Sequence, residues 1–433
     1  MLLLPLFKEV IIMRRVMYPI ACGIDVHKKK LACTIVIAKS IQDEPVYHHR
    51  NFSTHNYDLV KLADWLTHFD CHCVCMESTG KYWTPVFNYL EDRDFDITIT
   101  HPKYVKSPKG KKTDFLDSIH IADLFQMGEV QPSYIPDKEF RQLRDLSRYR
   151  YKITNFISSE KNRIQNCQTM SNITLASVVS DPFGVSASAV FSELLISPDF
   201  DDAHIRSLLR GSLKKKSEEV LNSIRGFHLG DDQSFKALLA LAHKQFLAEM
   251  KTDISSEISK RLSKYQPFID LALQVPGIGY DSATTIIAEV GVDMSVFPDA
   301  ENFTSWIGLT PTNNESADKK KSVRTSHAGT YLKPTLIQCA LAALKVKKCP
   351  YFKIKYDKIK KRRGHKHAII AIARMMAACL YHMFKDLKDF HPSDYEELMN
   401  PHPPKPRKQD VQAALELLQS AGGYTITPIT AAS

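Results

Sequence analysis

Four acidic residues in three short motifs could together perform metal-dependent chemistry. Asp25 lies in CGIDV, Glu77 follows the apolar run CVCM, and Asp114 and Asp117 lie in KTDFLD. Carboxylates supply the oxygen ligands that hard divalent cations such as Mg²⁺ prefer. Two such cations about 3.5–4 Å apart can stabilise both the entering and the leaving oxygen of a phosphodiester exchange. The four residues therefore indicate a metal centre that acts on phosphodiesters.

Each acid also has an ordinary structural interpretation. Side chains alternate along a strand, so Asp25, between two apolar residues, points either to solvent or to a site at the edge of its sheet. Thr113 or Asp114 could cap the helix that begins there. Asp114 and Asp117 are three residues apart and share one helical face, which suits a common ligand. On the residues alone, both interpretations stay open.

The elements that would position these acids form an α/β pattern. Apolar runs with the period of a strand alternate with amphipathic helical stretches up to residue 136. Strands are expected at 21–38, 46–53, 72–77 and 95–100, and helices at 56–68, 82–92 and 114–127. Asp25 and Glu77 then lie on strands, and the other two acids open the last helix.

The ordered motifs GID, MESTG and KTD-x-x-D resemble those of the DEDD-type transposases of the insertion-sequence 110 family. The resemblance implies an N-terminal RuvC-like domain with a ribonuclease-H-like fold. It further implies that Asp25, Glu77, Asp114 and Asp117 are catalytic and hold Mg²⁺, with Mn²⁺ as the alternative metal. Asp123, near the same motif, is expected to be structural or phosphate-facing.

The same resemblance implies a serine nucleophile in the C-terminal third. In the family this serine follows a GLTP turn and precedes basic residues, and the count from residues 308–311 reaches Ser316. A serine is a weak nucleophile until a base, a metal or a nearby cation activates it. The cations that follow, also expected to contact nucleic acid, are Lys319, Lys320, Lys321 and Arg324.

Three departures from the family pattern keep other serines open as nucleophiles. Ala317 stands where the family has glycine, the segment SVRTSHAG departs from the usual glycine-isoleucine-lysine pattern, and Lys333 stands where the family has arginine. Ser322 and Ser326 in the same stretch therefore remain reserve candidates. The departures do not affect the four acids.

A polyanionic partner is indicated by the charge of the chain. Lys and Arg number 58 against 48 Asp and Glu, and the pI is about 9.0, which favours nucleic acid. Between residues 345 and 366 basic residues far outnumber the single acid, Asp357. The candidates there for phosphate contact are Lys358, Lys360, Lys361, Arg362, Arg363 and Lys366.

Two further features near these cations allow two interpretations each. Gly277 and Gly279 in VPGIG form either a phosphate-holding turn at a helix N-terminus or a plain turn. The aromatic residues among the cations either stack on bases or form an apolar helix face, and the second use is favoured for at least two of them. These residues are Tyr351, Phe352 and Tyr356.

Five segments are expected, because 433 residues exceed one ordinary core. The fold class is α/β plus all-α. The segments are an N-terminal extension (1–17), the RuvC-like catalytic domain (18–136), a helical coiled-coil and connector region (137–265), a mostly helical transposase domain (266–390), and a Pro-rich linker and tail (391–433). Met13 and Met17 are alternative start sites.

The resemblance also implies partners and a reaction. The partners are donor and target DNA, a structured guide RNA encoded on the mobile element, and further copies of the chain in a dimer or tetramer. The reaction is DNA strand exchange through a covalent phosphoserine link. Two alternatives remain, namely a metal-dependent resolvase-like endonuclease without that link and a non-enzymatic nucleic-acid-binding protein.

The expected location is the cytoplasm, without membrane attachment. No stretch approaches the roughly 20 apolar residues of a membrane span. The cysteines lie in apolar runs without an even framework, which suits a reducing compartment.

Overall fold

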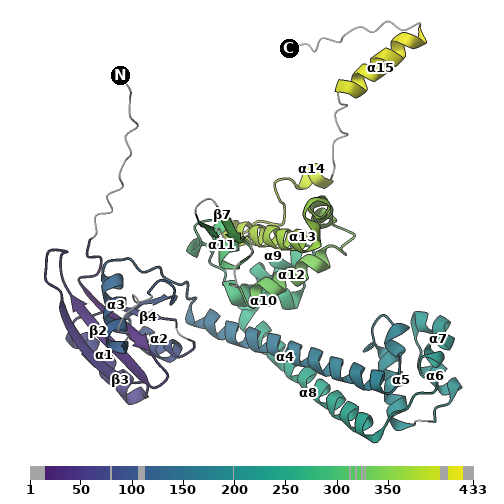
Figure 1. Ribbon diagram of the computed structural model, residues 1–433, viewed down its shortest axis with the longest axis horizontal. Helices are drawn as coiled ribbons and strands as arrows, with labels where there is room; N and C mark the ends of the chain where they lie inside the picture. Colours follow the sequence, from purple (N-terminus) through teal and green to yellow (C-terminus); the bar gives the residue numbers. More distant parts are fainter. Residues whose placement is uncertain are drawn as a thin grey trace. The chain divides into compact units, whose positions relative to one another are not determined.

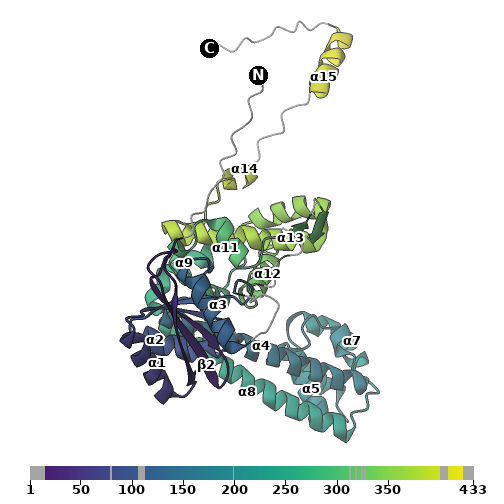
Figure 2. The ribbon, with the colours of Figure 1, turned by 60° about the vertical axis from the view of Figure 1, so that its left-hand side comes forward.

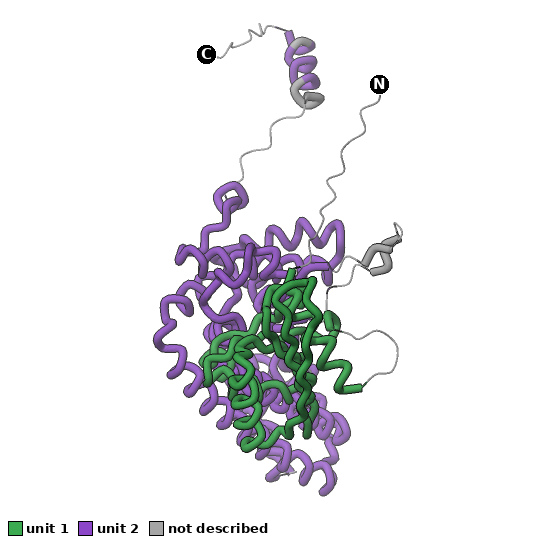
Figure 3. The backbone as a smooth tube through the Cα atoms, turned by 90° about the vertical axis from the view of Figure 1, so that its left-hand side faces the viewer, with its two compact units in different colours: residues 1–142 green, residues 143–433 purple. Residues whose placement is uncertain are grey.

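The chain folds into two compact units, residues 1–142 and 143–433 (Figure 3). The structure is a computed structural model that describes residues 15–78, 80–105, 113–197, 199–311, 314–316, 319–322, 325, 328–399 and 408–422. Most of the expected N-terminal extension therefore lies outside the described residues. The domain boundaries expected after residues 136, 265 and 390 stay predictions.

Unit 1 is built on a five-stranded mixed sheet with the order β3-β2-β1-β4-β5 (Figure 1). Its first three strands pair antiparallel, whereas β1, β4 and β5 run parallel. This order is that of ribonuclease-H-like domains, so the expected RuvC-like α/β fold is confirmed. The strands are β1 (Ile20–Val26), β2 (Lys30–Ile37), β3 (Val46–Ser53), β4 (Cys73–Glu77) and β5 (Asp96–Thr100).

The single strand expected at 21–38 is wrong, because the chain reverses direction at residues 27–29. The His27 N–H donates to the Lys30 carbonyl at 2.9 Å. The strands on either side of the turn pair in register, with Val26 opposite Leu31. The hairpin therefore brings Lys30 back to the carboxyl end of β1.

Helices cover both faces of the sheet. Ile24 of β1 belongs to a core shared with Leu62 and Leu90, which come from α1 (Asn56–His68) and α2 (Trp83–Glu91). Ala21 belongs to the opposite core with α3 (Asp114–Gln126). Because side chains alternate along a strand, Asp25 has the parity of Ala21 and lies on the α3 face.

The close approach of α3 to β1 depends on Gly23. A Cβ atom at this position would lie 2.3 Å from the Ala122 backbone nitrogen and 2.5 Å from the Ser118 carbonyl oxygen. Both neighbours are helix backbone, which cannot yield as a flexible side chain does. The glycine of the GID motif is therefore needed for the packing that carries α3 over the sheet.

We predict that Gly23→Ala lowers the free energy of unfolding by at least about 2 kcal/mol, because overpacking against rigid backbone is costly. Urea unfolding followed by circular dichroism measures the change. Gly279→Ala is the matched control, since a Cβ there meets nothing within 4 Å. Equal unfolding midpoints for both variants would contradict the packing argument.

Unit 2 begins with two long helices that lie side by side in both views (Figures 1 and 2). They are α4 (Lys138–Met170), which starts in unit 1, and α8 (Asp231–Leu262). His243 of α8 lies 2.9 Å from the Glu160 carboxylate of α4. The shorter helices between them, which share one core, are α5 (Val185–Ile196), α6 (Asp202–Leu208) and α7 (Ser217–Asn222). The expected helical arm is confirmed.

The C-terminal part of unit 2 is mostly helical, as expected. It also contains a small antiparallel hairpin, which the sequence pattern does not predict. The elements are α9 (Gln266–Gln274), α10 (Tyr280–Val290), α11 (Ala300–Trp306), β6 (Asn314–Ser316), β7 (Lys319–Ser322), α12 (Leu332–Ala343), α13 (Tyr351–Asp386), α14 (Tyr395–Met399) and α15 (Lys408–Ala421).

Arginines of α4 hold α10 through polar contacts. The Arg148 guanidinium donates to both carboxylate oxygens of the buried Glu289, at 2.7 and 2.9 Å. The buried Arg150 donates to the hydroxyls of Thr284 and Thr285 at 3.0 and 2.8 Å. Because buried charges need partners, these contacts fix how α4 meets the C-terminal helices within unit 2.

Helix α13 contains a kink and a long apolar stretch. Gly364 has φ 78° and ψ 172°, a conformation open to glycine but strained for other residues. Within the described residues, α13 is the helix that is long and apolar enough to cross a membrane by length and composition. However, 56% of its apolar window is buried inside the protein, as in a core helix.

Candidate active site

Two of the four acids lie on neighbouring parallel strands. Ile24 of β1 pairs with Met76 of β4, so Asp25 and Glu77 are the next residues along each strand. The carboxyl ends of parallel strands meet at the same edge of a sheet. Asp25 is 8% exposed, and Glu77 is half-buried.

The other two acids lie in the first turn of α3. Thr113 is the N-cap, and its hydroxyl accepts a hydrogen bond from the Leu116 N–H at 3.3 Å. This contact assigns the capping role to Thr113 and not to Asp114. Asp114 and Asp117 are also favoured there by the positive end of the helix dipole. The structure therefore brings the start of α3 to the face of the sheet that carries Asp25.

Two basic residues that the motifs do not reveal connect these acids. His27 Nε2 lies 3.1 Å from a carboxylate oxygen of Asp25 and 3.3 Å from one of Asp114. Lys30 Nζ donates to the other oxygen of Asp114 at 3.1 Å. The signal in the sequence that could have revealed His27 is the spacing Asp-x-His, because residues i and i+2 lie on one face of an extended chain.

The pKa values of the acids move in opposite directions. Burial raises the pKa of Asp25, and the carboxylates of Asp117 and Asp114 raise it further against the opposing effect of His27. The hydrogen bond from Lys30 lowers the pKa of Asp114. Asp117 and Asp114 therefore both contribute negative charge around Asp25.

These residues fit a divalent cation. One ligand atom from each of Asp25, His27 and Asp114 can be chosen so that all three lie within 4.8 Å of one another. Two carboxylates and the nearby Asp117 give the oxygen-rich environment that Mg²⁺ or Mn²⁺ prefers. A cation would also relieve the repulsion that raises the pKa of Asp25. Glu77, at the end of β4, and Asp117 are not part of this group of three, so their role as metal ligands stays a prediction.

The expected nucleophile lies on the small hairpin of unit 2. Ser316 is the last residue of β6 and pairs with Lys319 of β7. The side chains of Ser316, Ser322 and Lys319–Lys321 lie outside the described part of the structure, as do Arg324 and Ser326 altogether. The hairpin puts Ser316 directly before the two-residue connection to the lysine-rich strand.

The two glycines of VPGIG differ in their surroundings. Gly277 has φ 91°, and a Cβ there would lie 2.4 Å from the Cys339 carbonyl oxygen and 2.5 Å from the Ala343 nitrogen. Packing against α12 therefore accounts for Gly277. Gly279 is the N-cap of α10 and has open space around it, but the adjacent Asp281 adds negative charge to that helix end. A phosphate-holding role for either glycine stays a prediction.

The cations of α13 are exposed and surround its kink. Lys358, Lys360, Lys361, Arg362, Arg363 and Lys366 are all exposed. We call these six residues the basic surface. The aromatic residues among them are buried, and Tyr351, Phe352 and Tyr356 belong to the core. Base stacking by these three rings is therefore wrong, and the apolar helix face is confirmed.

Comparison with known proteins relates both parts of the chain to one family. Residues 22–170 match a model of IS110 DEDD transposases, and residues 269–357 match the transposase model of the IS116/IS110/IS902 family. The transposase for insertion sequence element IS1111A of Coxiella burnetii is 24% identical over 320 residues, covering 71% of this chain and 76% of the relative. A T. thermophilus RuvC structure in complex with a Holliday junction substrate aligns with 27% of this chain and all of its own, at 14% identity and a TM-score of 0.22.

The first match contains all four acids, and the second contains Ser316. Together the two matched regions span more than half of the chain. The order of the motifs, the RuvC-like fold and both matches lead to the same conclusion. The chain belongs to the IS110 family of transposases, which are DNA-recombining enzymes.

Proposed function

We propose that this chain cleaves and exchanges DNA strands at the ends of an insertion sequence, using Mg²⁺ or Mn²⁺ held by Asp25, Glu77, Asp114 and Asp117. The observation that carries this proposal is the convergence of Asp25 with the first turn of α3. A divalent cation bound there would stabilise the charge that develops on the scissile phosphate.

The residues around the acids have distinct roles in this proposal. Asp25 would be a buried ligand, and a bound cation would offset its charge. His27 bridges Asp25 and Asp114, and Lys30 holds the second oxygen of Asp114. These contacts fix the orientation of the Asp114 carboxylate before a cation binds, which limits the reorganisation needed on binding.

Ser316 is the proposed nucleophile. Its hydroxyl oxygen forms a new bond to the phosphorus while one bridging oxygen of the DNA strand leaves, and the serine proton passes to solvent or a nearby base. One phosphodiester replaces another, so the step is reversible and permits strand exchange. The cations at Lys319, Lys320, Lys321 and Arg324 are suited to neutralise the phosphate.

The proposed partners are donor and target DNA, a structured guide RNA encoded on the element, and further copies of the chain in a dimer or tetramer. The basic surface of α13 supports contact with nucleic acid, because exposed cations attract phosphates. The proposed location is the cytoplasm.

A denaturing gel tests the reaction. The chain is incubated with Mg²⁺ and labelled DNA that carries the ends of its element, and a heat-stable, protease-sensitive shifted band is expected. Cleavage without that band would favour the resolvase-like endonuclease, and binding without cleavage would favour the non-enzymatic protein.

Sequencing of RNA that co-purifies with the chain separately tests the guide RNA. One discrete species is expected, and a random sample of cellular RNA would contradict the proposal of a guide.

We predict that neutralising part of the basic surface flattens the salt dependence of DNA binding. For Lys360→Gln, Lys361→Gln and Arg362→Gln combined, the slope of log K against log salt should fall by about 0.7–0.9 for each phosphate that the protein no longer neutralises. Fluorescence anisotropy over a salt series measures the slope.

The control for this prediction replaces three other exposed cations of unit 2. Lys214, Lys215 and Lys216 are exposed and adjacent in sequence, so their combined change to Gln alters net charge equally. This control should keep the wild-type slope. An equal decrease in both triple variants would show a net-charge effect and no local phosphate site.

A further inference from the structure

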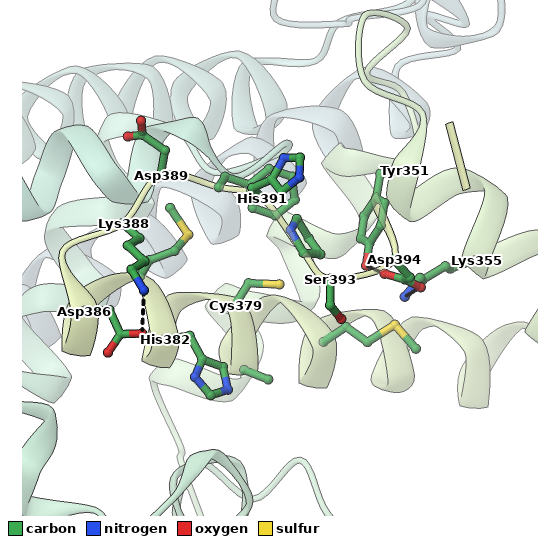
Figure 4. A pocket seen from close by; sticks show the side chains of 15 residues that line it. Tyr351, Lys355, Cys379, His382, Asp386, Lys388, Asp389, His391, Ser393 and Asp394 are labelled. Atoms are coloured by element: carbon green, nitrogen blue, oxygen red, sulfur yellow. Dashed lines mark hydrogen bonds and ion pairs between the residues drawn. The ribbon is translucent and has the colours of Figure 1, made fainter. Parts of the chain in front are cut away.

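A groove runs beside the second half of α13. Its volume is about 850 Å³, and apolar side chains of Met375, Ala378 and Phe390 line it. Figure 4 shows Cys379, His382 and Asp386 along the helix, with His391 and Ser393 on the segment that faces them. We call this feature the α13 groove. Most of its lining surface is apolar, and the groove is open to solvent.

The polar groups at one end of the α13 groove already have partners. Asp394 accepts a hydrogen bond from the Tyr351 hydroxyl at 2.7 Å and lies 2.6 Å from Lys355 Nζ. A ligand therefore gains little by contacting this carboxylate. The groove is better suited to apolar side chains than to a small charged molecule.

The length of the α13 groove suits a helix of two to three turns. Its lining residues on the second half of α13 run from Met375 to Asp386, which is about 16 Å at 1.5 Å per residue. An amphipathic helix that lays its apolar face into such a groove is a common mode of recognition.

Helix α15 carries an apolar sequence pattern short enough to fit within this length. Val411, Leu415 and Leu418 follow the spacing i, i+4, i+7, which is the pattern of one apolar helix face and spans about 10 Å. Leu418 on this face is 40% exposed. An exposed leucine on the apolar face of an amphipathic helix is suited to contact an apolar surface.

The chain between the two features is short and starts beside the groove. Tyr395 of α14 stacks on Tyr351 of the groove with ring centroids 5.8 Å apart. Residues 400–407 separate α14 from α15. These eight residues, four of them proline, reach about 25 Å when extended. This reach exceeds the length of the groove, and such a short connection gives a local concentration in the millimolar range.

We propose that the α13 groove is the docking site for the apolar face of α15 of the same chain. The tether favours this occupant over a second copy or another protein, because those must bind from much lower concentrations. Docking would cover the apolar face of α15, which includes Leu418, and the groove wall formed by residues 388–394. The inference does not depend on the recombination chemistry proposed above.

The thiol of Cys379 provides a measurement of docking in the full chain. It is half-buried in the groove, and burial raises its pKa to about 11, so rates are compared between variants and not with a free thiol. Alkylation by N-ethylmaleimide is followed peptide by peptide with mass spectrometry. Cys73 in unit 1 is the internal reference.

Leu415→Glu combined with Leu418→Glu should increase the alkylation rate of Cys379 at least tenfold, because glutamates oppose burial in the groove. Gln412→Glu combined with Ser420→Glu adds the same charge outside the apolar pattern and should keep the wild-type rate. Equal rates in all three proteins would overturn the proposal. Wild-type protection that disappears on hundredfold dilution would also overturn it, since the occupant would then be a second copy.

Discussion

Asp25→Asn should lower the rate of DNA strand cleavage by at least about 10³-fold. A bound cation supplies several kcal/mol of transition-state stabilisation, and each 1.36 kcal/mol corresponds to a factor of ten in rate. Asparagine keeps the shape of aspartate and can still accept a hydrogen bond from His27, 3.1 Å away, but it lacks the charge. Initial cleavage rates at saturating metal measure the effect.

The same substitution should leave the melting temperature unchanged or raise it. Burial, together with the carboxylates of Asp117 and Asp114, raises the pKa of Asp25. When the pKa of an acid is higher in the folded than in the unfolded protein, the free energy of unfolding decreases as the pH rises above the unfolded pKa, about 3.9. At neutral pH the ionised aspartate is therefore a cost, and asparagine removes it. A lowered melting temperature would show structural damage.

Asp123→Asn is the matched control on the same helix. Asp123 also has a pKa raised by burial, and it accepts a hydrogen bond from the Tyr47 hydroxyl at 2.9 Å, but it does not belong to the four acids. We expect cleavage within about threefold of wild type. Full cleavage by Asp25→Asn, or an equal loss in both variants, would contradict the assignment of Asp25.

The sequence predicted most elements of unit 1 because their periodicity is strong. It did not predict the hairpin between β1 and β2, since the turn at His27, Lys28 and Lys29 contains none of the glycine, proline or asparagine residues that usually mark one. Both strands are also almost entirely buried, so neither shows an alternation of polar and apolar residues that would mark where one strand ends and the next begins. The error matters for function, because this turn places His27 and Lys30 at the acids.

The acids themselves were predictable, whereas their basic partners were not. Motif order selects Asp25 and Asp114, but the contact of Lys30 with Asp114 joins residues 84 positions apart and depends on the packing of α3. Gly277 illustrates the opposite case. Its VPGIG motif allowed a phosphate-holding turn or a plain turn, and the structure adds a third reason for the glycine, the close approach of α12. Sequence periodicity carries no information on such distant packing.

Ser316→Ala should abolish the covalent protein–DNA adduct while DNA and metal binding persist. The substitution removes the attacking oxygen and little volume, and residue 316 stays the last residue of a short strand paired with Lys319. Loss of the nucleophile leaves water as the only attacking group, so adduct yield should fall below about 10⁻³ of wild type, as expected when a covalent catalyst is removed. The adduct is measured on a denaturing gel, and binding by anisotropy.

Ser322→Ala tests whether the effect belongs to one serine or to the whole hairpin. Ser322 pairs with Asn314 in the same two-stranded sheet, so its replacement makes the same chemical change on the same hairpin but leaves the proposed nucleophile. We expect this variant to keep its adduct. If Ser316→Ala still forms an adduct and Ser322→Ala does not, the nucleophile is the reserve serine. If both keep cleavage but neither forms an adduct, and Asp25→Asn remains inactive, water is the nucleophile and the acids act as a resolvase-like endonuclease.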